Sequence, residues 1–455
     1  MVWRRRSYSV THARVVALFA TAAAVLPAVA SADPPWNPAA VEGVSSTTTL
    51  LTTQIGGRIL IGTSNVRSLA SPTVVARVQA DGSTPRRQTL PIAYARAAAY
   101  ERAGIAVAGS RPAMTSAAAA KAPVLVALGS IRGIHGIGTP HALAGSEGQW
   151  VLAVGGNAGG TMVAVLTGSM YSAGAPSRTL WLRDGKSFRR ALTLHPGTNA
   201  REAAVAVGPR GDVLLVWQAR RGIYARHLDG GGHPGPMQRL GSGVQSALQA
   251  RIDDDGRLEV AWESQRVSEG FAATAATVSY TTAPRAGRFA APRVVGGSSL
   301  TGSGRYVMRP GVRLVATGPN TSMLAWTDYD GSHFGVKAAD VQTGTVHKSQ
   351  TVSPPAEDAV LGDLASAPAG GELVAWLTGT RGTGASGPQR VAAATRPPGA
   401  TAFSAPQLVS PPGTAADGAS VPFAPSAAVD SRSGSSLIAW TTISQQTNIA
   451  RSPPH

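Results

Sequence analysis

Short apolar runs, separated by turns rich in Gly, Pro, Asn and Asp, recur along most of the chain. Five of them share one pattern, in which a turn with Gly, Asp or Asn precedes an apolar run ending in tryptophan. These tryptophans are Trp217, Trp262, Trp326, Trp376 and Trp440, at spacings of 45, 64, 50 and 64 residues. Fifty-one residues before Trp217, Leu166 occupies the place where a tryptophan would stand. The apolar pattern therefore repeats at about fifty residues.

Each repeat has a second half, made of an alternating strand, a Gly/Pro turn and another short strand. Clear examples span 223–240, 278–295, 336–352 and 391–409, and 74–90 and 179–194 match as well. Four short strands per unit with regularly spaced turns predict an all-β fold. Repetition of such units at about fifty residues predicts a β-propeller of four-stranded blades.

The closing tryptophans have a physical role in such a ring. A single four-stranded blade cannot cover both of its faces, whereas in a ring each sheet covers its neighbour. Burial of one indole between adjacent sheets would stabilise the fold by roughly 4–6 kcal/mol as an upper bound. We therefore expect these tryptophans to lie between blades.

The units set the expected domain limits and the number of blades. We place them at 46–92, 98–145, 149–197, 201–243, 247–297, 307–353 and 358–410, within a propeller spanning 46–455. The units in 46–145 are degenerate and those in 149–451 are clearer. The last piece, 425–451, holds two or three strands only, which suggests closure by strands from the N-terminal end. We expect seven blades, with six or eight as alternatives, and the Ala-rich stretch 93–122 could instead be a helical insertion.

The N-terminus is typical of an export signal. Four arginines precede an apolar stretch from Val15 to Val29, and small residues follow, which predicts a signal peptide over 1–32 cleaved between Ala32 and Asp33. Residues 33–45 would then be a disordered start of a secreted or extracytoplasmic chain. An uncleaved membrane anchor is the alternative, and the pair Arg5-Arg6 leaves the general secretory and twin-arginine routes both open. No later stretch is long enough to span a membrane.

Composition excludes several kinds of chemistry. The chain of 455 residues has no Cys, which excludes disulfide frameworks, Cys-ligated metal sites and thiol catalysis. Its formal net charge is +17, which falls to +13 when the four arginines of 1–32 are removed. Such an excess could attract anionic polymers. The basic residues are dispersed, however, and aromatic residues make up only 5% of the chain, so dedicated nucleic-acid binding is not expected.

The turn-to-tryptophan pattern resembles repeats of secreted bacterial propellers in the sialidase-like superfamily. Those repeats carry a turn of the form Ser-x-Asp-x-Gly-x-Thr-Trp. The nearest matches here are Asp255-Gly256 before Trp262 and Asp430 with Gly434 before Trp440, in which the Ser and Thr positions do not align. The resemblance covers about 150–450 and implies a fold rather than an activity. The arginine cluster, Tyr–Glu pair and Asp acid of sialidases could not be assigned to numbered positions; Tyr171, Tyr224, Tyr280, Tyr306 and Tyr329 are candidates without a supporting pattern.

Motif searches give no catalytic set, cofactor site or metal site. His135 and His141 lie six residues apart in a Gly-rich segment and are expected to be loop histidines. The run Asp253-Asp254-Asp255-Gly256 lacks the spacing of a calcium loop and is expected to be a polar turn.

Polar residues just after the tryptophans could form a ring of side chains at one mouth of the propeller. They are Gln218, Glu263, Asp328 and Thr441. The sequence thus favours a secreted, non-enzymatic binding or scaffold protein that engages a glycan, a cell-envelope polymer or a protein partner on one face. The alternative is a glycoside hydrolase that uses carboxylates such as Glu263 and Asp328, since glycosidases pair two acids about 5–10 Å apart. The sequence leaves the oligomeric state open.

Overall fold

The computed structural model describes most of the chain after residue 35. The described residues are 36–452 except 42–43, 45, 54–56, 64–70, 80–82, 85, 102, 114–117, 119–120, 131–135, 158–159, 169–176, 186, 195–201, 220–221, 243–245, 268–272, 300–310, 356, 368–370, 380–388, 412–424 and 443–445. Trp36–His455 forms one compact unit. The predicted signal peptide, 1–32, lies outside the described residues.

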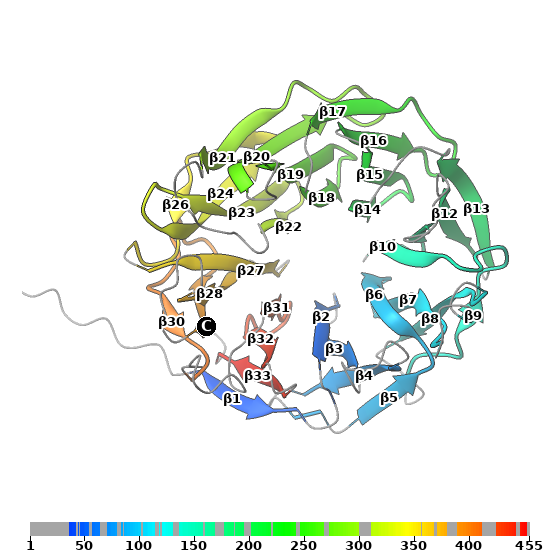
Figure 1. Cartoon of the computed structure of the whole chain (residues 1–455), viewed down its shortest axis with the longest axis horizontal. Coiled ribbons are helices and arrows are strands. Elements are labelled where there is room, and N and C mark those ends of the chain that lie inside the picture. Colours follow the sequence, from blue (N-terminus) through cyan, green and yellow to red (C-terminus); the bar gives the residue numbers. More distant parts are fainter. Residues whose placement is uncertain are drawn as a thin grey trace, which may run out of the picture. The chain divides into compact units, whose positions relative to one another are not determined.

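This unit is an all-β propeller of eight blades arranged in a ring (Figure 1). Seven blades were expected, and eight was one of the alternatives. Blades 1 to 4 consist of β2 (Ser46–Thr52), β3 (Arg58–Thr63), β4 (Thr73–Val78) and β5 (Arg86–Leu90); β6 (Ala93–Tyr100), β7 (Gly104–Ser110), β8 (Val124–Ser130) and β9 (His141–Ala142); β10 (Trp150–Gly156), β11 (Val163–Gly168), β12 (Arg178–Asp184) and β13 (Ser187–Leu194); and β14 (Ala203–Val207), β15 (Val213–Ala219), β16 (Gly222–Leu228) and β17 (Gln238–Ser242).

The second half of the ring repeats the same antiparallel order. Blades 5 to 8 consist of β18 (Ser246–Ile252), β19 (Leu258–Val267), β20 (Ala273–Ala283) and β21 (Arg293–Ser299); β22 (Val312–Gly318), β23 (Thr321–Tyr329), β24 (Phe334–Gln342), β25 (Thr345–Val346) and β26 (Gln350–Thr351); β27 (Ala359–Ser366), β28 (Glu372–Thr378), β29 (Arg390–Arg396) and β30 (Gln407–Leu408); and β31 (Ser426–Val429), β32 (Ser436–Thr441) and β33 (Thr447–Arg451) with β1 (Asn37–Ala40). In blade 6 both β25 and β26 pair with β24. The Ala-rich stretch that could have been helical begins with strand β6.

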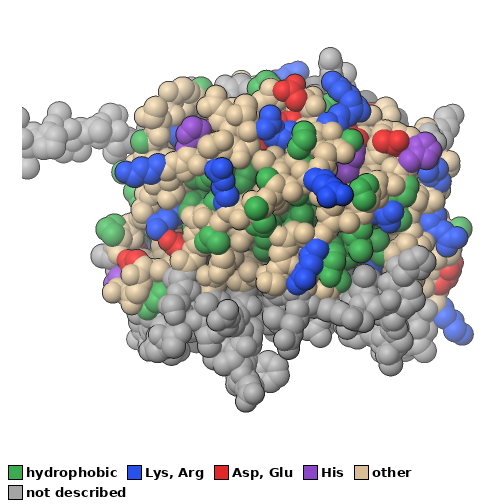
Figure 2. All heavy atoms as spheres, turned by 90° about the horizontal axis from the view of Figure 1, so that it is seen from above, with side chains coloured by type: hydrophobic (Ala, Val, Ile, Leu, Met, Phe, Trp, Pro, Cys, Tyr) green, Lys and Arg blue, Asp and Glu red, His purple; other side chains and the backbone are tan. Residues whose placement is uncertain are grey.

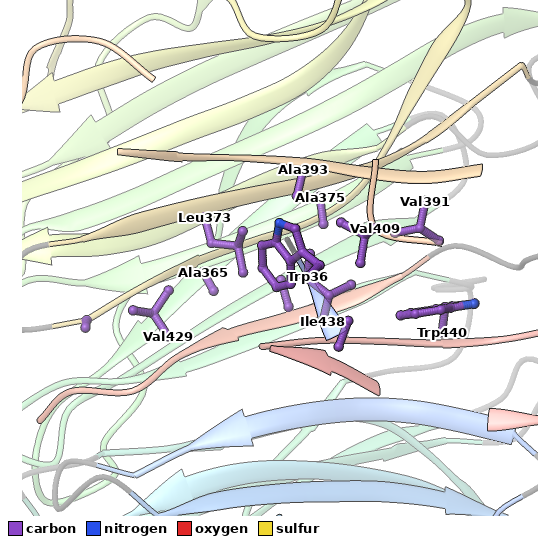
Figure 3. Packing of buried hydrophobic residues seen from close by; sticks show 13 residues of the cluster. Trp36, Ala365, Leu373, Ala375, Val391, Ala393, Val409, Val429, Ile438 and Trp440 are labelled. Carbon is purple, nitrogen blue, oxygen red and sulfur yellow. The ribbon is translucent and has the colours of Figure 1, made fainter. Parts of the chain in front are cut away.

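The ring is closed by the N-terminal strand, as the incomplete last unit suggested. β1 pairs antiparallel with β33 and supplies the outermost strand of blade 8. Just before it, Trp36 is 7% exposed and packs among Leu373, Val409 and Ile438 (Figure 3). Residues 36–40 are therefore ordered by the last blades, although disorder was expected over 33–45.

The innermost strands of neighbouring blades run in the same direction along the ring axis. Gly156 at the end of β10 lies against Ala99 near the end of β6, and Tyr94 and Trp150 meet at the starts of the same strands. We call the side where innermost strands begin the start face and the opposite side the end face. Because strands within a blade are antiparallel, the second strands end on the start face.

All five repeat tryptophans lie between blades, as predicted. Each is at most 3% exposed and packs against the preceding blade: Trp217 against Leu180 of blade 3, for example, and Trp376 against Met323 of blade 6. Glycines on outer strands make room for two of them. A Cβ at Gly241 would approach Trp262, and one at Gly296 would collide with the indole of Trp326. At these two seams, the indole fits because the facing residue on the outer strand is a glycine.

Blade 3 fills the tryptophan position differently from the sequence prediction. Leu166 faces blade 4 and packs with Trp217, so it does not occupy the equivalent position. By the alternation of β11, that position belongs to Thr167, the next residue on the strand. Trp181 of the third strand packs toward blade 2 instead, and its indole N–H donates to Thr167 Oγ1 at 3.0 Å. A tryptophan therefore still packs between blades 2 and 3, but it comes from the third strand, β12, instead of the second.

Charged groups join the seams on the end face. Arg58 of blade 1 donates through Nε to Asp430 of blade 8 at 2.8 Å, and both side chains are less than 10% exposed. Arg396 of blade 7 makes ion pairs with Glu372 of its own blade and with Asp340 of blade 6. These contacts hold blade edges together where the turns are short.

Helical segments long and apolar enough to cross a membrane are absent from the described part of the chain.

Candidate functional site

The polar residues that follow the tryptophans do not form an open ring. Gln218 and Thr441 lie at the ends of β15 and β32, whereas Glu263 lies inside β19. Gln218, Glu263 and Thr441 are only 5%, 2% and 5% exposed. Side chains alternate between the two faces of a strand. Because each indole packs toward the preceding blade, the residue after it points toward the following blade and is covered there. These positions are therefore structural.

The two carboxylates offered for hydrolysis are occupied or buried. Asp328 forms an ion pair with Lys337 Nζ at 2.5 Å and accepts a hydrogen bond from the backbone N–H of Gly297 at 2.9 Å. Gly297 belongs to the outermost strand of blade 5, so this carboxylate fastens β23 to its neighbour. Glu263 lies between β18 and β20 within its sheet. Neither residue offers the accessible acid that the hydrolase alternative requires.

The remaining sequence candidates fall into turns and cores or outside the described residues. His141 is exposed in β9, and Asp253 lies in the turn after β18, where its carboxylate accepts the N–H of Arg257 at 2.7 Å. Tyr280 is buried and donates to Glu259 at 3.0 Å; burial and the Glu259 charge raise its pKa. Tyr224 stacks on Trp217. Tyr171, Tyr306 and His135 are not described, and the described His, Asp and Glu form no cluster suited to a metal.

Few charges occur on the innermost strands. Their sequences contain Arg96, Arg251, Arg313 and Asp363, and no other charged residue. Arg251 is paired with Glu259 at 2.8 Å, and Arg313 is paired with Asp363 at 3.0 Å. Arg96 is exposed and makes no ion pair or side-chain hydrogen bond within the described residues. On the innermost strands, within the described residues, Arg96 therefore carries a positive charge that no neighbouring acid compensates.

An aromatic pair lies beside this charge on the start face. The rings of Tyr94 on β6 and Trp150 on β10 are tilted by 52° with centroids 4.5 Å apart, so they bridge blades 2 and 3. Tyr94 is 39% exposed, and Trp150 is half-buried. Nearly all other large apolar side chains in the described chain are covered. The pair is thus an accessible apolar surface at the start of two innermost strands.

Tyr94 adopts an uncommon backbone conformation. Its φ is 53°, in a bulge where β6 shifts register against β7 between Ala93 and Arg96. A left-handed conformation costs a residue with a Cβ roughly 1–2 kcal/mol. Such strain persists only where the surroundings impose it, and it concentrates at functional sites.

The surroundings of the bulge are well fixed. Ile92 is fully buried, and its carbonyl accepts the N–H and hydroxyl of Thr73 at 2.8 and 2.6 Å. Across the ladder, a Cβ at Gly109 would overlap the carbonyl of Ala93 and the side chain of Ile92. These contacts fix the chain just before Tyr94 and help to hold the tyrosine in its strained position.

Arg96 and Tyr94 lie on the same side of β6. Ala95 between them packs toward blade 1, whereas Arg96 pairs in register with Ala108, which packs toward blade 3. The structure thus combines an aromatic surface with a neighbouring free guanidinium, which can donate up to five hydrogen bonds.

The sequence analysis missed this site. Its one signal was a tyrosine inside an Ala-rich run, YARAAAY, that was considered as a helix. The bulge depends on Gly109 and Ile92, whose proximity is a tertiary effect.

Comparisons with known proteins identify no family for this chain. No protein-family model and no curated protein matches the sequence. Among solved structures, a prolyl endopeptidase is similar with a TM-score of 0.44 and 10% identity over 88% of this chain and 55% of its own. A post-proline cleaving enzyme from Rickettsia typhi follows, with a TM-score of 0.43, 9% identity, and 88% and 58% coverage. A polysaccharide lyase has a TM-score of 0.41, 8% identity, and 79% and 91% coverage.

The chain spans little more than half the length of the two peptidases. Similarities of this size carry no argument about activity.

Proposed function

We propose that this protein is a secreted, non-enzymatic propeller that binds a glycan at the start face, with a sugar ring resting on Tyr94 and Trp150. The observation that carries the proposal is the strained, exposed Tyr94 in contact with Trp150. A pyranose ring presents C–H groups on its faces, and these pack on an aromatic surface as other apolar groups do. Arg96 would donate hydrogen bonds to hydroxyl or acidic oxygens at the edge of the sugar.

The position of β1 supports export with cleavage after Ala32. The cut would leave Trp36 and Asn37–Ala40 on the mature chain, where they complete blade 8. A cut a few residues later would remove the buried indole. N-terminal sequencing of the protein from culture medium should give Asp33, and retention of residues 1–32 in a membrane fraction would support the uncleaved anchor.

The binding proposal is tested with the purified chain and a panel of soluble and cell-envelope polysaccharides. The single variants Tyr94→Ala and Trp150→Ala should each weaken binding by roughly tenfold, the loss expected when an aromatic contact of about 1–1.5 kcal/mol is removed. Tyr329→Ala is the matched control, because Tyr329 also forms a tilted aromatic pair, with Phe334 at 4.8 Å, on blade 6. Equal losses in all three variants, or unchanged binding in the first two, would contradict the proposed site.

Release of new reducing ends from the bound polysaccharide would favour the hydrolase alternative. Glu263→Gln and Asp328→Asn separate the two ideas, since a hydrolase using these acids would lose turnover while glycan binding at Tyr94 remained.

A further inference from the structure

The outermost strands of the blades carry an unbalanced set of charges. Their sequences contain six arginines and no Asp, Glu or Lys. The arginines are Arg86 and Arg87 on β5, Arg189 and Arg190 on β13, Arg239 on β17 and Arg293 on β21. In a soluble protein, surface charges of both signs are normally interspersed. The outer wall therefore departs from the ordinary pattern.

Blades 3, 4 and 5 are neighbours, so their arginines form a continuous arc, which we call the arginine arc. It comprises Arg190, Arg239 and Arg293, with Arg285 and Arg288 in the turn before β21. All five are exposed, and none forms an ion pair or side-chain hydrogen bond within the described residues. Figure 2 looks onto the wall at the top of Figure 1, where β17 lies, and shows more blue than red side chains.

Three acids of blades 4 and 5, Asp229, Asp254 and Asp255, lie in turns rather than on the outer strands. Asp229, in the turn after β16, accepts the N–H groups of Gly231 and His233 at 3.0 and 2.8 Å. Asp254 and Asp255 lie in the end-face turn of blade 5. None of them pairs with an arginine of the arc within the described residues.

Blade 1 also carries unbalanced positive charge on its outer strands, and there two arginines face each other. Arg77 and Arg86 are directly opposite in the β4–β5 ladder, and both are exposed. Like charges in this position repel each other and destabilise the strand pair. An anion bound between them would remove that cost.

The surface chemistry indicates what kind of anion fits. Among the residues that the structure describes, the exposed large apolar side chains of the outer strands are Val294 and Leu408, and no exposed aromatic side chain accompanies the arginines on these strands. Single-stranded nucleic acid is bound with aromatic stacking platforms as well as charge. Guanidinium groups alone suit sulfate, carboxylate or phosphate groups repeated along a sugar chain.

From the acid-free outer strands and the unpaired arginines of blades 3 to 5, we propose that the arginine arc is a second binding site, for a linear anionic polysaccharide laid along the outside of the ring. It is separate from the glycan site at Tyr94 and does not depend on it.

The test compares the purified chain on dextran sulfate and on uncharged dextran of the same length, by titration at 50 and 200 mM salt. Binding to dextran sulfate should weaken by at least about tenfold between the two salt concentrations, because the polymer releases condensed counterions. The triple variant Arg190→Gln/Arg239→Gln/Arg293→Gln should lose at least about tenfold in affinity at 50 mM salt and lower the salt slope by up to about three.

A matched control removes three exposed cations elsewhere, as Arg111→Gln/Lys121→Gln/Arg432→Gln. It has the same net charge as the triple variant and should keep nearly full affinity. Equal losses in both variants would show that net charge alone drives binding and would overturn the proposal. So would unchanged affinity in the arc variant, equal binding to dextran, or complete displacement by duplex DNA at equal charge concentration. The Tyr94→Ala variant should bind dextran sulfate normally, which distinguishes failure of this site from failure of the glycan site.

Discussion

The ion pair at the seam between the first and last blades makes a quantitative prediction. Arg58 donates to Asp430 at 2.8 Å and to Ser435 Oγ at 2.6 Å, while Asp430 also accepts the N–H groups of Arg432 and Ser433 at 2.8 and 2.9 Å. The substitution Asp430→Asn leaves the Arg58 guanidinium buried without its counter-charge. Breaking a buried pair in this way costs about 3–5 kcal/mol. Because folded proteins are stable by only about 5–15 kcal/mol, a loss of this size is readily measured.

The assay is equilibrium unfolding in guanidinium chloride, followed by tryptophan fluorescence and far-UV circular dichroism. Glu101→Gln is the control, because Glu101 and Arg183 also join neighbouring blades but lie 3.6 Å apart with the Glu101 side chain 43% exposed. It should cost less than about 1 kcal/mol. The double variant Arg58→Met/Asp430→Asn should recover part of the loss, since no buried charge is left alone. The reasoning is refuted if Asp430→Asn costs no more than Glu101→Gln, or if the double variant is no more stable than the single one.

The contribution of the Arg58–Asp430 ion pair to the free energy of unfolding should depend on pH. Burial tends to raise the pKa of Asp430, but the N–H groups of Ser433 and Arg432 and the Arg58 charge outweigh it, so the pKa lies below its ordinary value. A lowered pKa in the folded state means stability that is present above the unfolded-state pKa, about 4, and lost as the pH falls further. The difference in unfolding free energy between wild type and Asp430→Asn should therefore be constant near neutral pH and shrink below about pH 4.

Three further substitutions test packing and strain by the same unfolding assay. Trp36→Ala should cost about 3–5 kcal/mol, the usual loss for a buried indole, and a loss under 1 kcal/mol would mean that the N-terminal strand does not close the ring. Gly296→Ala should cost about 1–3 kcal/mol because the new methyl meets the Trp326 indole, and unchanged stability would contradict that contact. Tyr94→Gly should be more stable than Tyr94→Ala, since glycine accepts a positive φ, whereas Arg96→Gly should be less stable than Arg96→Ala; the same order at both positions would rule out strain at Tyr94.

The repeat itself was visible in the sequence because every blade has the same burial problem. Alternating apolar residues and turn glycines mark the clear blades, and in blades 4 to 8 a tryptophan lies on the second strand. The expected number of blades was one too low because the fourth strand of blade 8, Asn37–Ala40, is hard to detect. It has four residues without apolar alternation and is separated from its partner β33 by about four hundred residues of sequence. No local pattern connects the two.

The functional residues were harder to predict because they depend on contacts between blades. Gln218 and Glu263 were chosen for their position after a tryptophan, but strand alternation sends them into the next seam. Tyr94 was overlooked because its exposure follows from a bulge that Gly109 and Ile92 impose from other parts of blade 2 and its connection. The alternation of apolar and polar residues in a sequence indicates which face of a regular strand is buried. A bulge interrupts this alternation at one residue, so the exposure of that residue cannot be predicted from the pattern.

The distribution of charge separates the residues that fold the ring from those available to a ligand. Asp430, Glu259 and Glu372 are nearly fully buried, and each compensates an arginine across or within a seam. Removing such an acid destabilises the fold, so loss of binding in those variants would not identify a site. Arg96 and three arginines of the arc, Arg190, Arg239 and Arg293, make no ion pair within the described residues, so their substitution leaves every described ion pair intact. For this protein, a loss of binding after arginine substitution at the perimeter or at Arg96 reports on ligand contact when it exceeds the loss in a control variant of the same net charge, whereas a change after acid substitution at a seam reports on folding.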